Sequence, residues 1–198
     1  AWTHDETTLA VENPATGQVL TYVADASPEV AMRALDAAVS AQDAWAATEP
    51  RVRAELLRAA YERIIERSDD FAAVMTLEMG KPLAESLGEI SYGANFLDWF
   101  AAEGERAYGE TIPSHLAHSR LSVQMQPLGV TVAITPWNFP AAMITRKAGA
   151  ALAAGCTMIV KPAPETPLSA LALAKLAQEA GMPAGVFQVI TGEAAPLA

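Results

Sequence analysis

The last third of the chain alternates β-prone runs with helical segments, and this alternation constrains the fold more than any other feature. From Gly129 onward, strands are predicted at 130–135, 157–161 and 186–190, and helices at 141–154 and 168–180. The second helix is polar only along Lys175, Gln178 and Glu179, as expected for a helix that lies on a sheet. Strands joined by helices form parallel sheets, so this part is predicted to be an α/β unit.

The preceding 128 residues predict a hairpin, then four helices, then a strand. Turn formers between Val11 and Leu20 favour the hairpin, and helices are expected to begin at Ser27, Pro50, Ser68 and Leu83. The segment 120–126 alternates apolar and polar residues and predicts a half-exposed strand. The first two helices are expected to bury Val30, Ala34, Leu35, Ala38, Val39, Val52, Leu56, Ala60 and Ile64. The opposite face of the second helix, with Arg53, Arg58, Glu62 and Glu66, is expected to be solvated.

The charge and the cysteine content exclude several classes of partner. A net charge of -10 on 198 residues disfavours nucleic acid and anionic membranes, although one basic site can still bind a nucleotide. No apolar run approaches the length of a membrane span, and the first residues lack a signal-peptide pattern. The single cysteine, Cys156, excludes an intramolecular disulfide and is typical of a reducing cytoplasm. We therefore expect a cytoplasmic protein.

The segment Ile134-Thr135-Pro136-Trp137-Asn138-Phe139-Pro140 is the strongest candidate for a functional site. It follows a predicted parallel strand, and open α/β sheets bind ligands at the carboxyl ends of their strands. Two prolines stiffen the loop, and the Asn138 amide could donate a hydrogen bond to a developing oxyanion. The alternative is an asparagine that satisfies its own turn, and the residues alone favour that alternative.

Lys161 ends the next predicted strand and is expected at the same edge of the sheet as Asn138. Its ammonium group could bind ribose hydroxyls or phosphate. A solvated lysine at the end of a strand is an equally good interpretation of the position alone.

Several segments together resemble the aldehyde dehydrogenase superfamily. They are the heptapeptide at 134–140, then 143–147 (MITRK), 153–157 (AAGCT), Lys161-Pro162 and 185–187 (GVF), with 77–82 (LEMGKP) and 108–113 (YGETIP) upstream. The match covers nearly the whole chain in the right order. The upstream segments and 143–147 are similar to the succinate-semialdehyde dehydrogenase branch in particular. The resemblance implies NAD(P)-dependent oxidation of an aldehyde, most specifically of succinate semialdehyde to succinate.

The resemblance also implies roles for the residues of the heptapeptide and for two lysines. Asn138 would be the side-chain donor of the oxyanion hole, and Lys161 the ligand of the adenosine ribose or its 2′-phosphate. Ile134, Thr135, Pro136 and Trp137 would line the cofactor crevice. Lys147 would be a buried lysine near the reaction centre, with a salt bridge between helix and loop as the alternative.

Arg146 is the candidate residue for selecting the substrate. It and Lys147 are the only charges on an otherwise apolar predicted helix, and a buried arginine requires an anionic partner. By resemblance, Arg146 would bind the distal carboxylate of succinate semialdehyde. The alternative is an ion pair between helices, which would leave an aldehyde dehydrogenase for another substrate.

One position departs from the family pattern and bears on the cofactor. NAD-preferring members of the family commonly have a glutamate three residues after the lysine, where this chain has Pro164. Without that carboxylate a 2′-phosphate meets no like-charge repulsion, so NADP is favoured and NAD remains possible. Glu165, one residue later, could partly replace the missing carboxylate.

The remaining reactive side chains have structural interpretations. Cys156 is expected to be a buried packing thiol and not the nucleophile. His115 and His118 have the spacing of metal ligands but no third ligand, so surface histidines are expected and no metal site. Glu78 and Glu103 are expected to be structural charges in helices.

The resemblance implies three regions and an incomplete fold. Residues 1–118 would form the hairpin and helical part of the cofactor-binding domain, 119–128 an oligomerisation strand of a homo-oligomer, and 129–198 the first half of a Rossmann-like domain. The family's nucleotide-binding glycine segment, general-base glutamate and nucleophilic cysteine match positions beyond Ala198. The chain alone is therefore expected not to oxidise aldehydes. A cofactor-binding or assembly module without catalysis is the non-enzymatic alternative.

Overall fold

A computed structural model describes residue 2 and residues 7–193, and its carboxyl-terminal part has the alternating pattern expected from the sequence. The elements are β5 (Thr131–Ile134), α5 (Ala142–Ala153), β6 (Met158–Lys161), α6 (Pro167–Glu179) and β7 (Phe187–Val189). The three strands are parallel, in the order β5-β6-β7. The prediction of an α/β fold with a parallel sheet is confirmed.

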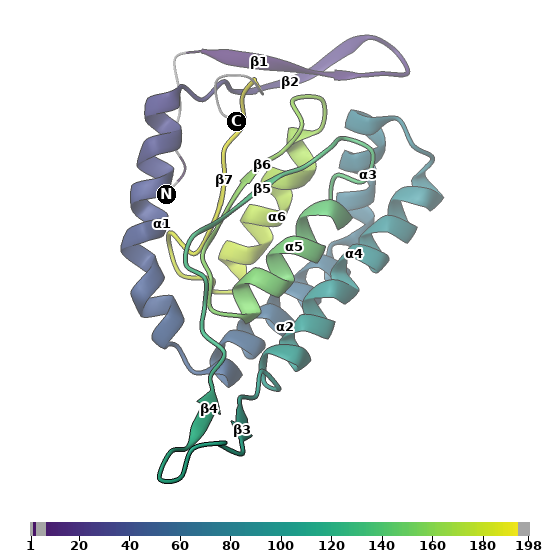
Figure 1. Cartoon of the computed structure of the whole chain (residues 1–198). Helices are drawn as coiled ribbons and strands as arrows, with labels where there is room; N and C mark the ends of the chain where they lie inside the picture. The colour runs from purple at the N-terminus through teal and green to yellow at the C-terminus, as the bar shows by residue number, and fades with distance from the viewer. Residues whose placement is uncertain (1, 3–6, 194–198) are drawn as a thin grey trace.

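Helices cover both faces of this sheet (Figure 1). Helix α1 (Pro28–Ala47) packs against β6 and β7 on one face, while α5 and α6 lie on the other. An outer layer packs onto α5 and α6 and consists of α2 (Pro50–Glu66), α3 (Ser68–Met79) and α4 (Leu83–Gly104). The apolar side chains between these layers form one continuous core, so the helices before residue 105 and the sheet support each other.

Local signals account for the helix boundaries. The Ser27 hydroxyl accepts a hydrogen bond from the N–H of Val30 at 3.4 Å, and Pro28 occupies the first helical position of α1. Helix α3 ends at Gly80, whose φ of 84° is the left-handed conformation that glycine adopts without strain. None of the helices in the described ranges is long and apolar enough to cross a membrane.

Two hairpins lie outside the parallel sheet, at opposite ends of the molecule (Figure 1). The expected amino-terminal hairpin consists of β1 (Thr8–Asn13) and β2 (Gln18–Ala24), with Gly17 at a φ of 67° in its turn. The second pairs β3 (Glu110–Ile112) with β4 (Leu121–Val123). The sequence did not indicate β3, and β4 is shorter and more exposed than the strand predicted at 120–126.

Three predictions about the first two helices are wrong. Val39 and Val52 are exposed, because the buried face of α2 is centred on Leu57 and that of α1 on Ala38 and Trp45. Arg53 is buried, not solvated. Its guanidinium donates to the main-chain oxygen of Ala153 at 3.1 Å and to that of Thr48, which are carbonyls at the ends of α5 and α1. A buried arginine is stable there because it satisfies carbonyls that have no partner within a helix.

Candidate active site

The loop after β5 and the end of β6 lie together at the carboxyl edge of the sheet. Ile134, the last residue of β5, is paired with Lys161, the last residue of β6, and the Thr135 N–H donates to the Lys161 oxygen at 3.1 Å. The strands follow one another across the sheet in chain order, β5-β6-β7, as the first three strands of a doubly wound fold do. In such folds the ligand crevice lies outside the carboxyl end of the first strand, which here is β5. The Asn138 loop occupies that place.

The side chain of Asn138 is exposed and available to a ligand. None of the described residues forms a hydrogen bond with its amide. Only the main-chain oxygen of Asn138 is held, by the Lys81 ammonium group at 3.2 Å. A free amide on a loop that is fixed through its main chain suits a hydrogen-bond donor that must act on a substrate.

Behind this loop lies a buried ion pair between Lys81 and Glu89. Both side chains are almost fully buried, and the Lys81 ammonium group lies 4.4 Å from the centre of the Phe139 ring. The second carboxylate oxygen of Glu89 accepts the N–H groups of Ala141 at 2.9 Å and Ala142 at 3.1 Å. Sequence reasoning singled out neither residue. The segment 77–82 contains Lys81, but nothing in the sequence pairs it with Glu89.

Lys161 is buried, and the alternative of a solvated lysine is therefore wrong. Its ammonium group donates to the Pro162 oxygen at 2.8 Å. Burial lowers the pKa of Lys161, while the carboxylates of Glu193, Glu165 and Asp25 oppose that shift. The ammonium group has further donors that the Pro162 oxygen does not use.

The other residues expected to line the cofactor crevice differ in exposure. Ile134, Pro136 and Trp137 are exposed, whereas Thr135 is buried between the ends of β5 and β6. In the loop after β6, Pro164 is half-buried and Glu165 is exposed. Of the exposed members, Ile134, Pro136 and Trp137 are apolar, and Ile134 is paired with Lys161 across the sheet.

Arg146 and Lys147 lie on the exposed face of α5, opposite the buried stripe that contains Ile144 and Ala148. The expectation that these two cations are buried is wrong for this chain. The Arg146 guanidinium carbon lies 5.5 Å from the centre of the Phe96 ring, and no described carboxylate pairs with it. Lys147 donates to the main-chain oxygen of Met143 at 3.1 Å and forms no salt bridge with a described residue.

The remaining candidates have structural positions. Cys156 is buried and unpaired, as expected of a packing thiol, and His115 and His118 are exposed. Glu103 pairs with Arg106 on the surface. Glu78 is buried and accepts the N–H groups of Leu168 and Ser169, each at 2.7 Å, at the start of α6. Burial raises the pKa of Glu78 to about 7, against the effect of these hydrogen bonds.

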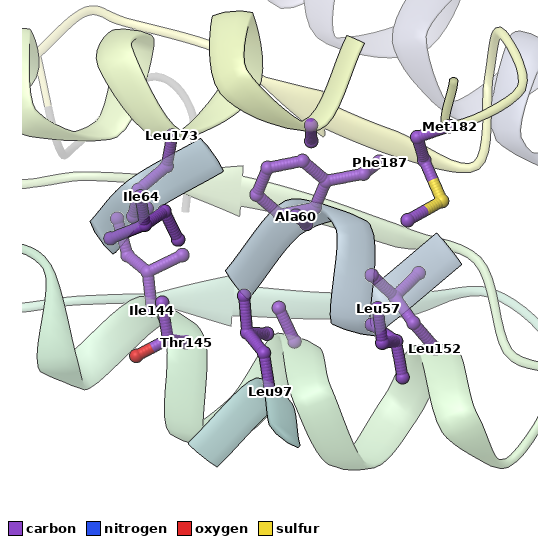
Figure 2. A pocket seen from close by; sticks show the side chains of 12 residues that line it. Leu57, Ala60, Ile64, Leu97, Ile144, Thr145, Leu152, Leu173, Met182 and Phe187 are labelled. Carbon is purple, nitrogen blue, oxygen red and sulfur yellow. The ribbon is translucent and has the colours of Figure 1, made fainter. Parts of the chain in front are cut away.

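A cavity between α2, α4, α5, α6 and β7 is a packing defect and not a ligand site (Figure 2). Its volume is about 30 Å³, on the scale of a water molecule and not of a nucleotide. Its lining is apolar except for the Thr145 hydroxyl, which already donates to the Ala141 oxygen. The carboxyl edge of the sheet therefore remains the candidate site.

The fold is that of the doubly wound α/β proteins, and comparison with known proteins identifies the family. The model of the aldehyde dehydrogenase family matches residues 2–198. The chain therefore belongs to the aldehyde dehydrogenase family, and the resemblance seen in the sequence is confirmed.

The relatives include enzymes named for semialdehydes. The chain is 60% identical over 186 residues to a succinate-semialdehyde dehydrogenase [NADP(+)] of Escherichia coli K12, covering 94% of this chain and 39% of the relative. It is 56% identical to a glutarate-semialdehyde dehydrogenase of Pseudomonas aeruginosa, with the same coverage. The crystal structure of an NADP-dependent enzyme of E. coli matches with a TM-score of 0.98 at 56% identity, covering 100% of this chain and 41% of that one. The chain thus spans about two fifths of the length of these relatives.

Proposed function

We propose that the whole protein containing this chain oxidises an aldehyde with a distal carboxylate, most specifically succinate semialdehyde, to the acid with NADP or NAD. The observation that carries the proposal is Arg146, an exposed guanidinium without a carboxylate partner in the described residues, one turn into the helix that follows the Asn138 loop. Relatives at 56 to 60% identity are named for semialdehydes of succinate and glutarate, which both carry such a carboxylate.

The residues of this chain would bind and polarise the substrate. The planar fork of Arg146 suits a bidentate carboxylate, and the ring of Phe96 limits where the guanidinium can lie. The amide of Asn138 would donate to the oxygen of the aldehyde carbon as negative charge develops there. Cys156 is buried, so we propose that the nucleophile lies outside residues 1–198.

Lys161 fits a dinucleotide, because it is a buried ammonium group with unused donors at the carboxyl end of a parallel strand. It would bind the adenosine ribose or a 2′-phosphate, and the bound nicotinamide would accept hydride from the substrate. Pro164 places no carboxylate at the position where the family's NAD-preferring members have one. We therefore favour NADP, as in the E. coli relative named for NADP(+).

The β3–β4 hairpin is proposed to join subunits of a homo-oligomer. It projects from the body of the molecule (Figure 1), and its Ile112, Leu121 and Val123 are exposed. Exposed apolar side chains on a hairpin with unpaired outer edges are typical of a surface that another chain covers.

A substrate panel on the whole protein tests the proposed activity. We expect kcat/KM for succinate semialdehyde to exceed that for butanal, an uncharged aldehyde of equal length, by about 30-fold or more, since a charge-assisted bidentate bond contributes roughly 2–4 kcal/mol. Glutarate semialdehyde and pentanal provide the second pair and show which chain length fits. Equal values of kcat/KM within both pairs would refute selection for a carboxylate.

A further inference from the structure

We propose that the buried Lys81–Glu89 ion pair is a positioning device that sets the orientation of Asn138 by holding the middle and the carboxyl end of its loop. The inference rests on the proposed role of Asn138 as an oxyanion donor. Lys81 and Glu89 themselves are not expected to touch the substrate, because both side chains are buried behind the loop.

The contacts of the pair fix three main-chain groups within five residues. Lys81 donates to the oxygen of Asn138, and Glu89 accepts the N–H groups of Ala141 and Ala142. The two side chains are joined to each other, so the oxygen of Asn138 and the start of α5 are held by one connected pair. The Lys81 ammonium group also lies over the Phe139 ring.

The loop has little backbone freedom of its own, and the ion pair restricts part of what remains. Pro136 and Pro140 restrict φ at two positions and provide no N–H donors. Neither proline ring restricts ψ of Asn138, the angle that sets the peptide group after Asn138 relative to its Cβ and so to its side chain. Lys81 fixes that peptide group, and the amide of Asn138 has no hydrogen bond to a described residue that could orient it instead.

Helix capping alone does not explain the pair. Helix α5 has no side-chain cap of its own, and Glu89 supplies one from α4. Glu78 does the same for α6, and no cation among the described residues pairs with it. Lys81 is thus unnecessary for capping. Replacing a buried ion pair by well-packed apolar side chains is often neutral or stabilising, so net stability does not explain this pair, and in some proteins such pairs fix a defined geometry.

A double-mutant cycle on kcat in the whole enzyme tests the inference. The variants are Lys81→Met, Asn138→Ala and the combination of both, assayed with the best aldehyde of the panel at saturating cofactor. We expect Lys81→Met to lower kcat by about 10- to 100-fold, because a donor displaced by roughly 1 Å loses most of its effect in the transition state. KM for the cofactor should change less than about twofold, since Lys161 is unaffected.

In the Asn138→Ala background, Lys81→Met should lower kcat by less than about twofold, because the donor that it positions is gone. Equal losses in both backgrounds would overturn the inference and make the pair merely structural. If Asn138→Ala left kcat unchanged, the proposed oxyanion role itself would fail, and the positioning role with it. The two failures are therefore distinguishable.

Glu89→Gln provides a second variant if Lys81→Met does not fold. It keeps an oxygen for the N–H groups of Ala141 and Ala142 but loses the charge that holds Lys81, so the same loss of coupling to Asn138 is expected. Glu78→Gln is the matched control, because it alters a buried capping carboxylate that does not contact the loop. Glu78→Gln should change kcat by the same factor in the parent and in the Asn138→Ala background. Coupling of Glu78→Gln to Asn138 as strong as that of Glu89→Gln would also overturn the inference.

Discussion

Pro164 is the residue at which the choice between the two cofactors can be tested directly. It lies three residues after Lys161, in the loop between β6 and α6, and is half-buried. Three carboxylates already act on Lys161, namely Glu193, Glu165 and Asp25. A fourth at position 164 would increase the negative potential around the proposed ribose site and could accept hydrogen bonds from the ribose hydroxyl groups.

Replacing Pro164 by Glu in the whole enzyme should therefore shift the preference from NADP toward NAD. We expect the ratio of kcat/KM for NADP over NAD to fall by about 5- to 150-fold, corresponding to roughly 1–3 kcal/mol of partly screened repulsion. Pro164→Ala is the control for the loss of the proline ring and should change the ratio little. If the glutamate and alanine variants have the same ratio as the parent, position 164 does not face the ribose.

Single residues also show where sequence reasoning reached its limit. The position of Lys161 at the end of a strand was predictable, because parallel strands align their carboxyl ends. Its burial was not, and neither was that of Arg53, because burial depends on which carbonyls and side chains surround a cation in three dimensions. For Arg146 and Lys147 the error was the opposite one: both were expected to be buried and both are exposed, because an apolar helix buries only the face that meets its neighbours.

At the scale of elements, the starts of α5 and α6 share one design. Neither helix has a cap within its own sequence, and each receives a buried glutamate from the outer layer of helices. Glu89 caps α5 and Glu78 caps α6, each through two main-chain N–H groups. Carboxylates stabilise helix amino termini through these hydrogen bonds and through the helix dipole.

Glu78 makes the stability of this layer dependent on pH. Its pKa in the folded protein is about 7, above the ordinary value of 4.5, because burial and the nearby Glu89 disfavour its charge. A raised pKa means that its contribution to stability is fully present below pH 4.5 and is lost as the pH rises through 7.

Replacing Glu78 by Gln should remove this dependence in the whole protein. We expect the free energy of unfolding of the parent, relative to the variant, to fall between pH 4.5 and pH 8 by an amount on the order of 3 kcal/mol. Denaturant unfolding of both proteins across this range measures the difference, and Glu103→Gln on the surface is the control. A difference between parent and variant that is constant with pH would contradict the raised pKa.

The elements differ in how well their sequences predict them. The strands and helices after residue 129 were predictable to within two residues, because short apolar runs alternate with longer helical segments that are followed by a glycine, Gly155 or Gly181. The three-residue strand β3 carries no periodic pattern and was missed. Val39 and Val52 were assigned to the wrong face, because α1 is rich in alanine and α2 has adjacent apolar residues at Leu56-Leu57 and Ile64-Ile65, so that each helix permits more than one apolar stripe. The Lys81–Glu89 pair was not predictable, because its contacts with the Asn138 loop depend on tertiary packing and not on a local sequence pattern.

At the scale of the whole molecule, the described residues would supply one side of the proposed site. The exposed amide of Asn138, the guanidinium of Arg146 and the buried ammonium group of Lys161 all belong to elements that end or begin at the carboxyl edge of the sheet. The neighbouring Val132 and Ile134 expose apolar side chains on the edge strand β5. We expect the nucleophile of the whole enzyme to face this side.

The most direct test of the account is the effect of Arg146→Leu on a matched pair of aldehydes in the whole enzyme. The account predicts that kcat/KM for succinate semialdehyde falls by about 30- to 1000-fold, as expected for the loss of a charge-assisted bond of roughly 2–4 kcal/mol. The value for butanal should change less than about threefold, because that substrate offers no carboxylate. Arg63→Leu, which removes an exposed arginine from α2, is the control and should leave both values unchanged. An equal fall for the two aldehydes in Arg146→Leu would contradict the account, because it would show that Arg146 is structural and does not select the substrate.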